Sequence, residues 1–314
     1  MAGVDPKQFR LLMVSAMYEN GGNTTQRLLD GHPQLFVYPF ESQVGTRAVQ
    51  DHLSALYPAK YRWPEFLLSA TAAEDYSAII DEETKVRART PNVSKFRDFP
   101  FDFSDDERKQ RFTELLAESK RSRGSIIAAF FVATFQVWKD YHRSGHEVAY
   151  VGYSPIIAVD AERILADLPL AHVVHVVRNP WSAYADTLKR PVPLTLAHYM
   201  RGWTVCQESA LAARAAEPDR IHIVRFEDLV QNPAGILGDL CGKMGLEADP
   251  TLGQPSWNGA ALTQVYPWGT IKTPTAEANI ATARELSRDQ ANEVRRLAGQ
   301  VLEQFDYQGF GDGL

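Results

Sequence analysis

The sequence predicts an α/β fold of three layers, with a central parallel sheet flanked by helices and a mostly helical insertion. Two observations predict it. Short runs rich in Val and Ile recur along the chain, and each is separated from the next by enough residues for a helix. Such runs are typical of strands that are buried on both faces. In addition, Gly21 and Gly22 lie between the first apolar run and an amphipathic segment, as in a tight strand-to-helix turn.

Five segments are predicted as strands from their apolar and β-branched residues. They are Leu11–Ser15, Leu35–Tyr38, Val148–Val151, His172–Val177 and Ile221–Val224. A helix containing Leu28 and Leu29 is expected to begin near Asn23. A second helix is expected from about Ser287 to Phe305. The insertion runs from about Val44 to Gly145, and insertions at the rim of a sheet often form lids or acceptor walls.

Length and composition fit a single globular domain spanning residues 1–314. The net charge of −6 argues against a nucleic-acid partner but leaves room for an anionic cofactor, which needs only a few local cations. The apolar stretch Ile126–Trp138 is too short to cross a membrane and is predicted to form a buried helix. Cys206 and Cys241 show no metal-ligand spacing, and the sequence indicates a cytoplasmic protein without a membrane partner.

The turn after the first strand has the residues of an anion-binding loop. Two glycines let the backbone approach a ligand closely, and free N–H groups and hydroxyls at the start of the next helix face the same point. A simple capped turn is the alternative. A Walker loop would end in Gly-Lys-Ser/Thr, and no lysine is present, which disfavours kinase chemistry. The segment reads Asn20-Gly21-Gly22-Asn23-Thr24-Thr25.

A second candidate element follows the clearest strand. Arg178 stands at its carboxyl end, where ligands bind in open α/β sheets. Asn179 suits a helix N-cap and Pro180 suits the first helical turn, so a helix N-terminus is expected to open beside a cation. This combination fits a phosphate group, although an ordinary Arg–carboxylate pair would also explain the arginine.

The order of these segments resembles the PAPS-dependent sulfotransferase family, in its bacterial small-molecule and tyrosylprotein-like branches. The loop resembles the family's 5′-phosphosulfate loop, and Arg178-Asn179-Pro180 resembles its 3′-phosphate motif. The run from Leu28 to Pro33, followed by a strand and Phe40-Glu41, fits as well. The resemblance implies a P-loop-like fold with PAPS (3′-phosphoadenosine 5′-phosphosulfate) as cofactor and PAP as product. It also implies a closing loop over the nucleotide, formed here by Trp268, Gly269, Thr270 and Lys272.

The chain departs from the family pattern at three positions. The family's basic loop residue aligns with Asn20, and the lysine of a Lys-Thr-Pro segment aligns with Tyr153. The serine that follows the 3′-phosphate arginine by eight residues is Asp186. A carboxylate would repel a phosphate, so Ser182 or Thr187 is expected to provide the hydroxyl. Arg27 and Lys272 are the candidates for the missing cation.

Sulfuryl transfer needs a base for the acceptor's proton. The resemblance assigns this role to Glu41, and His32 is the second candidate because histidine titrates near neutrality. Glu41 at a helix start and His32 at a helix end also have structural explanations. Aromatic residues of the insertion, either acceptor contacts or core, include Tyr57, Tyr61, Trp63 and Phe66.

Together these features predict in-line transfer of a sulfuryl group from PAPS to a hydroxyl or amine of a small-molecule acceptor, without a metal. The alternative is a non-catalytic nucleotide- or ligand-binding relative, which the altered positions Asn20, Tyr153 and Asp186 favour. A nucleoside-phosphate kinase would require a catalytic lysine and Mg²⁺ ligands that the sequence does not offer.

Overall fold

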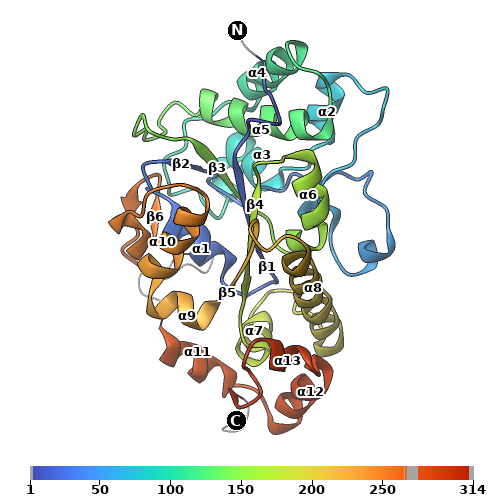
Figure 1. Ribbon diagram of the computed structural model, residues 1–314, viewed down its shortest axis with the longest axis vertical. Coiled ribbons are helices and arrows are strands. Elements are labelled where there is room, and N and C mark those ends of the chain that lie inside the picture. The colour runs from blue at the N-terminus through green and yellow to red at the C-terminus, as the bar shows by residue number, and fades with distance from the viewer. Residues whose placement is uncertain (1–2, 265, 267–274, 311–314) are drawn as a thin grey trace.

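The computed structural model describes residues 3–264, 266 and 275–310 and confirms the α/β fold (Figure 1). Within these residues, five parallel strands form one sheet in the order β2-β3-β1-β4-β5. Each predicted strand is present, with ends that differ by at most two residues. The strands are β1 (Leu11–Ala16), β2 (Leu35–Val37), β3 (Ala149–Tyr153), β4 (His172–Val177) and β5 (Ile221–Arg225).

Helices cover both faces of the sheet because alternate residues of each strand point to opposite sides. On one face, Val14 and Val174 pack with leucines of α1 (Gly22–Leu29) and α10 (Pro233–Lys243). On the other, Met13 and Val173 pack with α5 (Arg123–Val137) and α6 (Ala161–Asp167). The long helix α8 (Leu196–Ala216) extends this second layer along the sheet (Figure 1).

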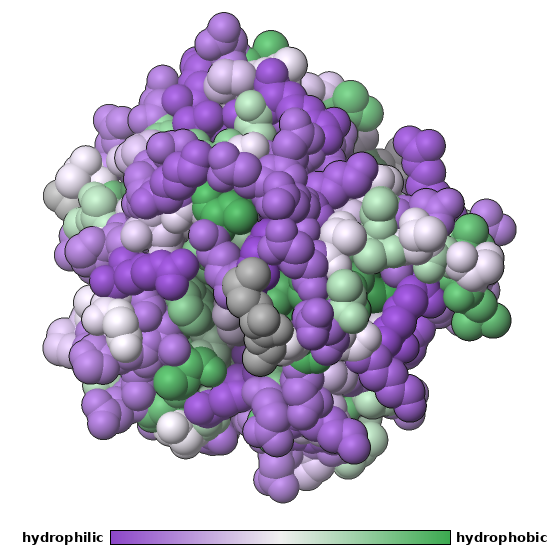
Figure 2. All heavy atoms as spheres, turned by 90° about the horizontal axis from the view of Figure 1, so that it is seen from above, coloured by the Kyte–Doolittle hydropathy of each residue, from purple (hydrophilic) through white to green (hydrophobic). Residues whose placement is uncertain are grey.

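The insertion lies at one end of the molecule and contains both helices and long irregular segments (Figure 1). The expected buried helix is α5, which ends at Val137 with Trp138 as its C-cap. Figure 2 views the molecule from this end and shows a mainly hydrophilic surface with scattered hydrophobic side chains. The other helices of the insertion are η1 (His52–Ala55), η2 (Ala59–Tyr61), α2 (Ala72–Ala78), α3 (Glu82–Arg89), η3 (Pro91–Val93) and α4 (Asp105–Ala117).

A buried ionic network joins the insertion to the sheet. Arg108 of α4 is fully buried, and its guanidinium donates to Asp81 at 2.6 Å, to Asp105 at 2.9 Å and to the Tyr76 hydroxyl at 2.7 Å. Its Nη1 also donates to the hydroxyl of Tyr38, the residue after β2, at 3.2 Å. Arg108 therefore fixes α3, α4 and the end of β2 relative to one another.

The remaining helices follow the later strands. The predicted terminal helix 287–305 is in fact two helices, α12 (Arg288–Ala298) and α13 (Val301–Gln304). Gly299 has a φ of 54°, which ends α12 because this conformation cannot continue a right-handed helix. The other elements are η4 (Ile157–Asp160), α7 (Pro180–Thr187), α9 (Phe226–Gln231), η5 (Pro250–Gly253), β6 (Ser256–Trp257), β7 (Ala260–Ala261) and α11 (Ala276–Ala283).

The strand order places β1 at the centre, with β3 on one side and β4 on the other. The loops that leave the carboxyl ends of β1 and its neighbours run to opposite sides, which opens a crevice where α/β sheets hold ligands. No helix among the described residues is long and apolar enough to span a membrane.

Candidate active site

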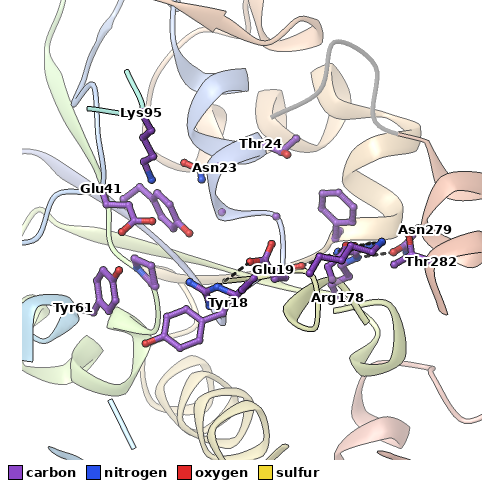
Figure 3. Close-up of a pocket in the computed structure, with 18 of the residues that line it drawn as sticks. Tyr18, Glu19, Asn23, Thr24, Glu41, Tyr61, Lys95, Arg178, Asn279 and Thr282 are labelled. Atoms are coloured by element: carbon purple, nitrogen blue, oxygen red, sulfur yellow. Dashed lines mark hydrogen bonds and ion pairs between the residues drawn. The ribbon is translucent and has the colours of Figure 1, made fainter. Parts of the chain in front are cut away.

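A pocket of about 720 Å³ opens at the carboxyl ends of the strands (Figure 3). Glu41, Tyr61 and Lys95 lie at one end, and Arg178, Asn279 and Thr282 lie at the other. Asn23 and Thr24 of the glycine loop lie between these two groups. The pocket therefore brings together parts of the chain that are far apart in the sequence, namely the loop after β1, the segment after β2, the insertion, the turn after β4 and α11.

Both glycines of the loop are required by its geometry. Gly21, the N-cap of α1, has a φ of 95°, and a Cβ there would overlap the ring of Phe226. A Cβ at Gly22 would overlap the ring of Tyr153. The close approach turns the N-terminus of α1 toward the pocket, where its first backbone N–H groups have no partner within the helix. Anion binding by this loop, which the sequence predicts, stays a prediction.

Only part of the predicted loop faces the pocket. Gly21, Gly22, Asn23 and Thr24 line it, whereas the Thr25 hydroxyl donates to the carbonyl of Gly21 at 3.0 Å and is buried. Thr25 therefore stabilises the turn from behind.

Asn20 is fully buried behind the loop and uses its whole amide there. Its Nδ2 donates to the Tyr18 carbonyl at 2.9 Å and to the Tyr199 hydroxyl at 3.1 Å. Its Oδ1 accepts from the backbone N–H of Arg178 at 2.9 Å and from the indole of Trp203 at 3.3 Å. An amide suits this position because the side chain must both donate and accept hydrogen bonds. Asn20 joins the loop after β1 to the turn after β4.

Arg178 lies at the carboxyl end of β4 and lines the pocket, as predicted. Its Nε donates to Asn279 Oδ1 at 2.6 Å, and its Nη1 donates to the carbonyl of Glu19 at 2.9 Å. The same Nη1 forms an ion pair with Asp186 at 2.7 Å. Its guanidinium also lies 5.3 Å from the centre of the Phe226 ring.

The two candidate hydroxyls on α7 do not line the pocket. Ser182 is buried, and its Oγ donates to the carbonyl of Asn279 at 2.6 Å. Thr187 donates to the carbonyl of Ala183 at 3.0 Å. The pocket-facing residue of this helix is Asp186. Asn179 is the N-cap, as predicted, and accepts from the Ser182 N–H at 2.8 Å.

Glu41 follows β2 and lines the pocket opposite Arg178. Its backbone N–H donates to Glu83 Oε2 at 3.1 Å, and its Oε2 accepts from Gln43 at 3.4 Å. Tyr61 lies beside it, and burial together with the Glu41 carboxylate raises the pKa of that phenol well above its ordinary value. Of the four aromatic candidates in the insertion, Tyr61 lines the pocket. Tyr57 and Trp63 are buried in the core, and Phe66 lines a separate hollow.

Lys95 supplies a cation that the sequence patterns did not identify. It comes from the insertion, lines the pocket near Glu41 and forms an ion pair with Glu83 at 2.6 Å. Burial lowers the pKa of Lys95, but the carboxylates of Glu83 and Glu41 outweigh this effect and raise it overall. Burial and the charge of Glu41 raise the pKa of Glu83 to about 7. Lys95 precedes no glycine and follows no strand, so its sequence context carries no signal for the site.

Other candidates lie elsewhere. His32 is buried outside the pocket, with Nε2 bonded to the carbonyl of Glu247 at 2.9 Å and Nδ1 accepting from the Gln34 N–H at 3.1 Å. Arg27 is also buried, stacks on Trp257 at 5.0 Å and does not line the pocket. The predicted closing-loop residues Trp268, Gly269, Thr270 and Lys272 lie outside the described residues.

The parallel sheet, the glycine loop at a helix N-terminus and the arginine at a neighbouring strand end define the class of P-loop-like α/β proteins that bind anionic ligands. Within that class, the model of the sulfotransferase family matches residues 20–250. The chain therefore belongs to the sulfotransferase family, whose members are PAPS-dependent transferases.

Two solved structures share the fold over almost the whole chain. The sulfotransferase domain from the olefin synthase of Synechococcus PCC 7002 is 18% identical, with a TM-score of 0.55, and the match covers 97% of this chain and 98% of that one. The sulfotransferase domain from the curacin biosynthetic pathway is 16% identical, with a TM-score of 0.52 and coverage of 96% and 98%. No curated protein matches the sequence significantly.

Proposed function

We propose that this protein transfers a sulfuryl group from PAPS to a hydroxyl or amine of a small-molecule acceptor, with Glu41 as the general base. One observation carries the proposal: a single pocket is lined by the glycine loop, by Arg178 and by Glu41. The N-terminus of α1 would receive the 5′-phosphosulfate of the donor. Arg178 would receive its 3′-phosphate, and the acceptor would enter at the end formed by Glu41 and Tyr61.

These positions support the following chemistry at the Glu41 end. The acceptor's proton passes to the Glu41 carboxylate as the acceptor's oxygen or nitrogen forms a bond to sulfur. The bond between sulfur and the bridging oxygen of the donor breaks, and PAP leaves with the electron pair. Because charge spreads over the transferred group, positioned cations and backbone N–H groups stabilise the transition state.

Lys95 is the described cation that best replaces the basic residue missing from the loop. It lines the same pocket as Asn23 and lies at the Glu41 end, where the sulfuryl group would be transferred (Figure 3). Its ion pair with Glu83 holds the ammonium in place, and Glu83 also accepts from the Glu41 backbone. Glu83 is therefore a positioning residue that fixes the base and the cation relative to each other.

A non-catalytic nucleotide-binding relative is the second candidate. Asp186 favours it, because this carboxylate already pairs with the arginine that would bind the 3′-phosphate. Nucleotide binding without any transfer to an acceptor would support this alternative.

The experiment joins a binding measurement to a turnover measurement. PAP, at a hundred times its dissociation constant, should stabilise the protein by about 2.7 kcal/mol in a thermal-shift titration. Release of PAP from PAPS is then measured with a panel of alcohols, phenols and amines. Arg178→Ala should weaken PAP binding. The absence of a PAP shift would contradict the proposal.

Glu41→Gln tests the base. We expect it to keep PAP binding and to lower turnover by about a hundredfold to ten-thousandfold, because the amide cannot accept the proton. Glu208→Gln, at an exposed position on α8, is the matched control and should leave turnover unchanged. Wild-type turnover in Glu41→Gln would remove Glu41 from this role.

A further inference from the structure

The arginine of the proposed 3′-phosphate site forms an ion pair with a carboxylate of the protein itself. Arg178 Nη1 and Asp186 Oδ2 are 2.7 Å apart, and their side chains are 9% and 26% exposed. Asp186 follows Arg178 by eight residues. Helix α7 begins two residues after the arginine, and Asp186 lies in the last turn of this helix.

The position of Asp186 on its own helix is unfavourable. It lies in the last turn of α7, where the aligned peptide dipoles place partial negative charge and destabilise a carboxylate. Two cations offset this effect. Arg178 holds Oδ2, and Lys189 donates to Oδ1 at 3.0 Å. The charge of the Asp186 carboxylate is therefore stabilised by the cations of the pocket and not by its own helix.

The other partners of Arg178 keep the guanidinium fixed. Asn279 accepts from Nε and, through its own amide, donates to Glu227 at 2.8 Å. The carbonyl of Glu19 accepts from Nη1. Both partners are neutral acceptors, whereas Asp186 carries the charge. A phosphate that approaches this guanidinium would meet the negative charge of the Asp186 carboxylate, which is bonded to Nη1.

We propose that Asp186 is a specificity-determining residue of the donor site, which occupies the place on Arg178 that a 3′-phosphate would take. The 3′-phosphate must displace the carboxylate in order to bind, so it adds little to the affinity for the nucleotide. A nucleotide with a free 3′-hydroxyl meets no such competition, because a hydroxyl can donate to a carboxylate. This inference rests on the proposed function.

The pocket provides a place for the displaced carboxylate. Lys189 already binds its second oxygen, and Lys189 is itself held by Glu285 at 2.9 Å. Rotation of Asp186 away from Arg178 would keep the bond to Lys189 and release one N–H of Nη1, while the bond from Nη1 to the Glu19 carbonyl stays. The exchange therefore moves one side chain and leaves α7 in place.

The experiment compares PAP with 5′-AMP, which differ only by the 3′-phosphate. Dissociation constants for both are measured by calorimetry in the wild type, in Asp186→Ser and in the isosteric Asp186→Asn. We expect the ratio of the AMP constant to the PAP constant to rise at least about tenfold in both variants, since each removes a like charge adjacent to the phosphate. The affinity for AMP should change little. Asp219→Asn, on the surface before β5, is the matched control and should leave the ratio unchanged.

The outcomes separate the two proposals. If the wild type binds PAP but both folded variants keep the wild-type ratio, the role of Asp186 is overturned and the proposed function stands. If neither nucleotide binds to any folded form of the protein, the proposed function fails and this inference fails with it. A wild-type ratio already far above that of the variants would also overturn the role.

Discussion

At the scale of single residues, Asn20 shows why the basic residue of the family pattern cannot simply be put back at this position. Alignment with the family places a basic residue here, yet the amide is buried and makes four hydrogen bonds with Tyr18, Tyr199, Arg178 and Trp203. A lysine at this position would lose the acceptor that Arg178 and Trp203 require and would bury an unpaired charge.

We therefore expect Asn20→Lys to lower the free energy of unfolding by about 2 kcal/mol or more and to weaken PAP binding. Urea denaturation and a PAP titration measure the two effects. Asn92→Lys, at an exposed position of the insertion, serves as the matched control. A stable Asn20→Lys variant with tighter PAP binding would show that Asn20 has no role in joining the loop to the turn after β4.

His175 offers a second residue-scale prediction. It is fully buried on β4, where it bonds to Ser15 at 3.1 Å and to Gln207 at 2.6 Å. Burial lowers the pKa of His175 to about 4. The unfolded chain therefore takes up a proton near pH 6.5 that the folded protein does not, and this histidine favours unfolding progressively as the pH falls from about 6.5 to 4.

Replacing His175 by Gln removes this difference in proton binding between the unfolded and folded states. Between pH 5 and 6, we expect the slope of unfolding free energy against pH to be smaller in His175→Gln than in the wild type, by up to about 1.4 kcal/mol per pH unit. Urea denaturation at several pH values measures both slopes. Because Glu19 and Glu83 act in the opposite direction, only the difference between the two proteins is diagnostic. Equal slopes would contradict the assignment.

At the scale of elements, the Arg108 network decides where the insertion sits. Removing the guanidinium would leave the carboxylates of Asp81 and Asp105 without their buried cation. We expect Arg108→Met to lower the free energy of unfolding by about 3–5 kcal/mol, as measured by urea denaturation. Arg97→Met, at an exposed arginine of the insertion, is the control. A change within 1 kcal/mol, roughly the range of ordinary surface substitutions, would contradict this role.

The sequence predicted elements better than it predicted their ends and their contacts. Apolar runs located the five strands of the central sheet because burial on both faces leaves a strong compositional signal. The two-residue strands β6 and β7 carry no such signal and were not predicted. The break at Gly299 was missed because a single glycine inside a helical pattern does not reveal its φ. Arg108 was missed because its partners, Asp81 and Tyr76, meet it only through the packing of α2, α3 and α4.

At the scale of the whole molecule, the candidate site could be predicted where it follows strands and not where it depends on packing. Gly21, Arg178 and Glu41 each follow a strand, and parallel strands deliver such residues to one edge of the sheet. Lys95 and Asn279 reach the same pocket from the insertion and from α11, which no local pattern indicates. Packing also explains why some residues were wrongly placed in the site. Ser182 and Arg27 have suitable chemistry, but their side chains make contacts in the protein interior.

The two ends of the pocket are built by different stretches of chain. The turn after β4 and α11 form the Arg178 end, the segment after β2 and the insertion form the Glu41 end, and Asn23 and Thr24 of the loop after β1 lie between them. Tyr61 and Lys95 thus belong to a part of the protein that contributes no residue to the central sheet. Under the proposed function, acceptor preference would therefore be a separable trait, which replacement of the insertion would exchange while the loop after β1 and the turn after β4 stay unchanged.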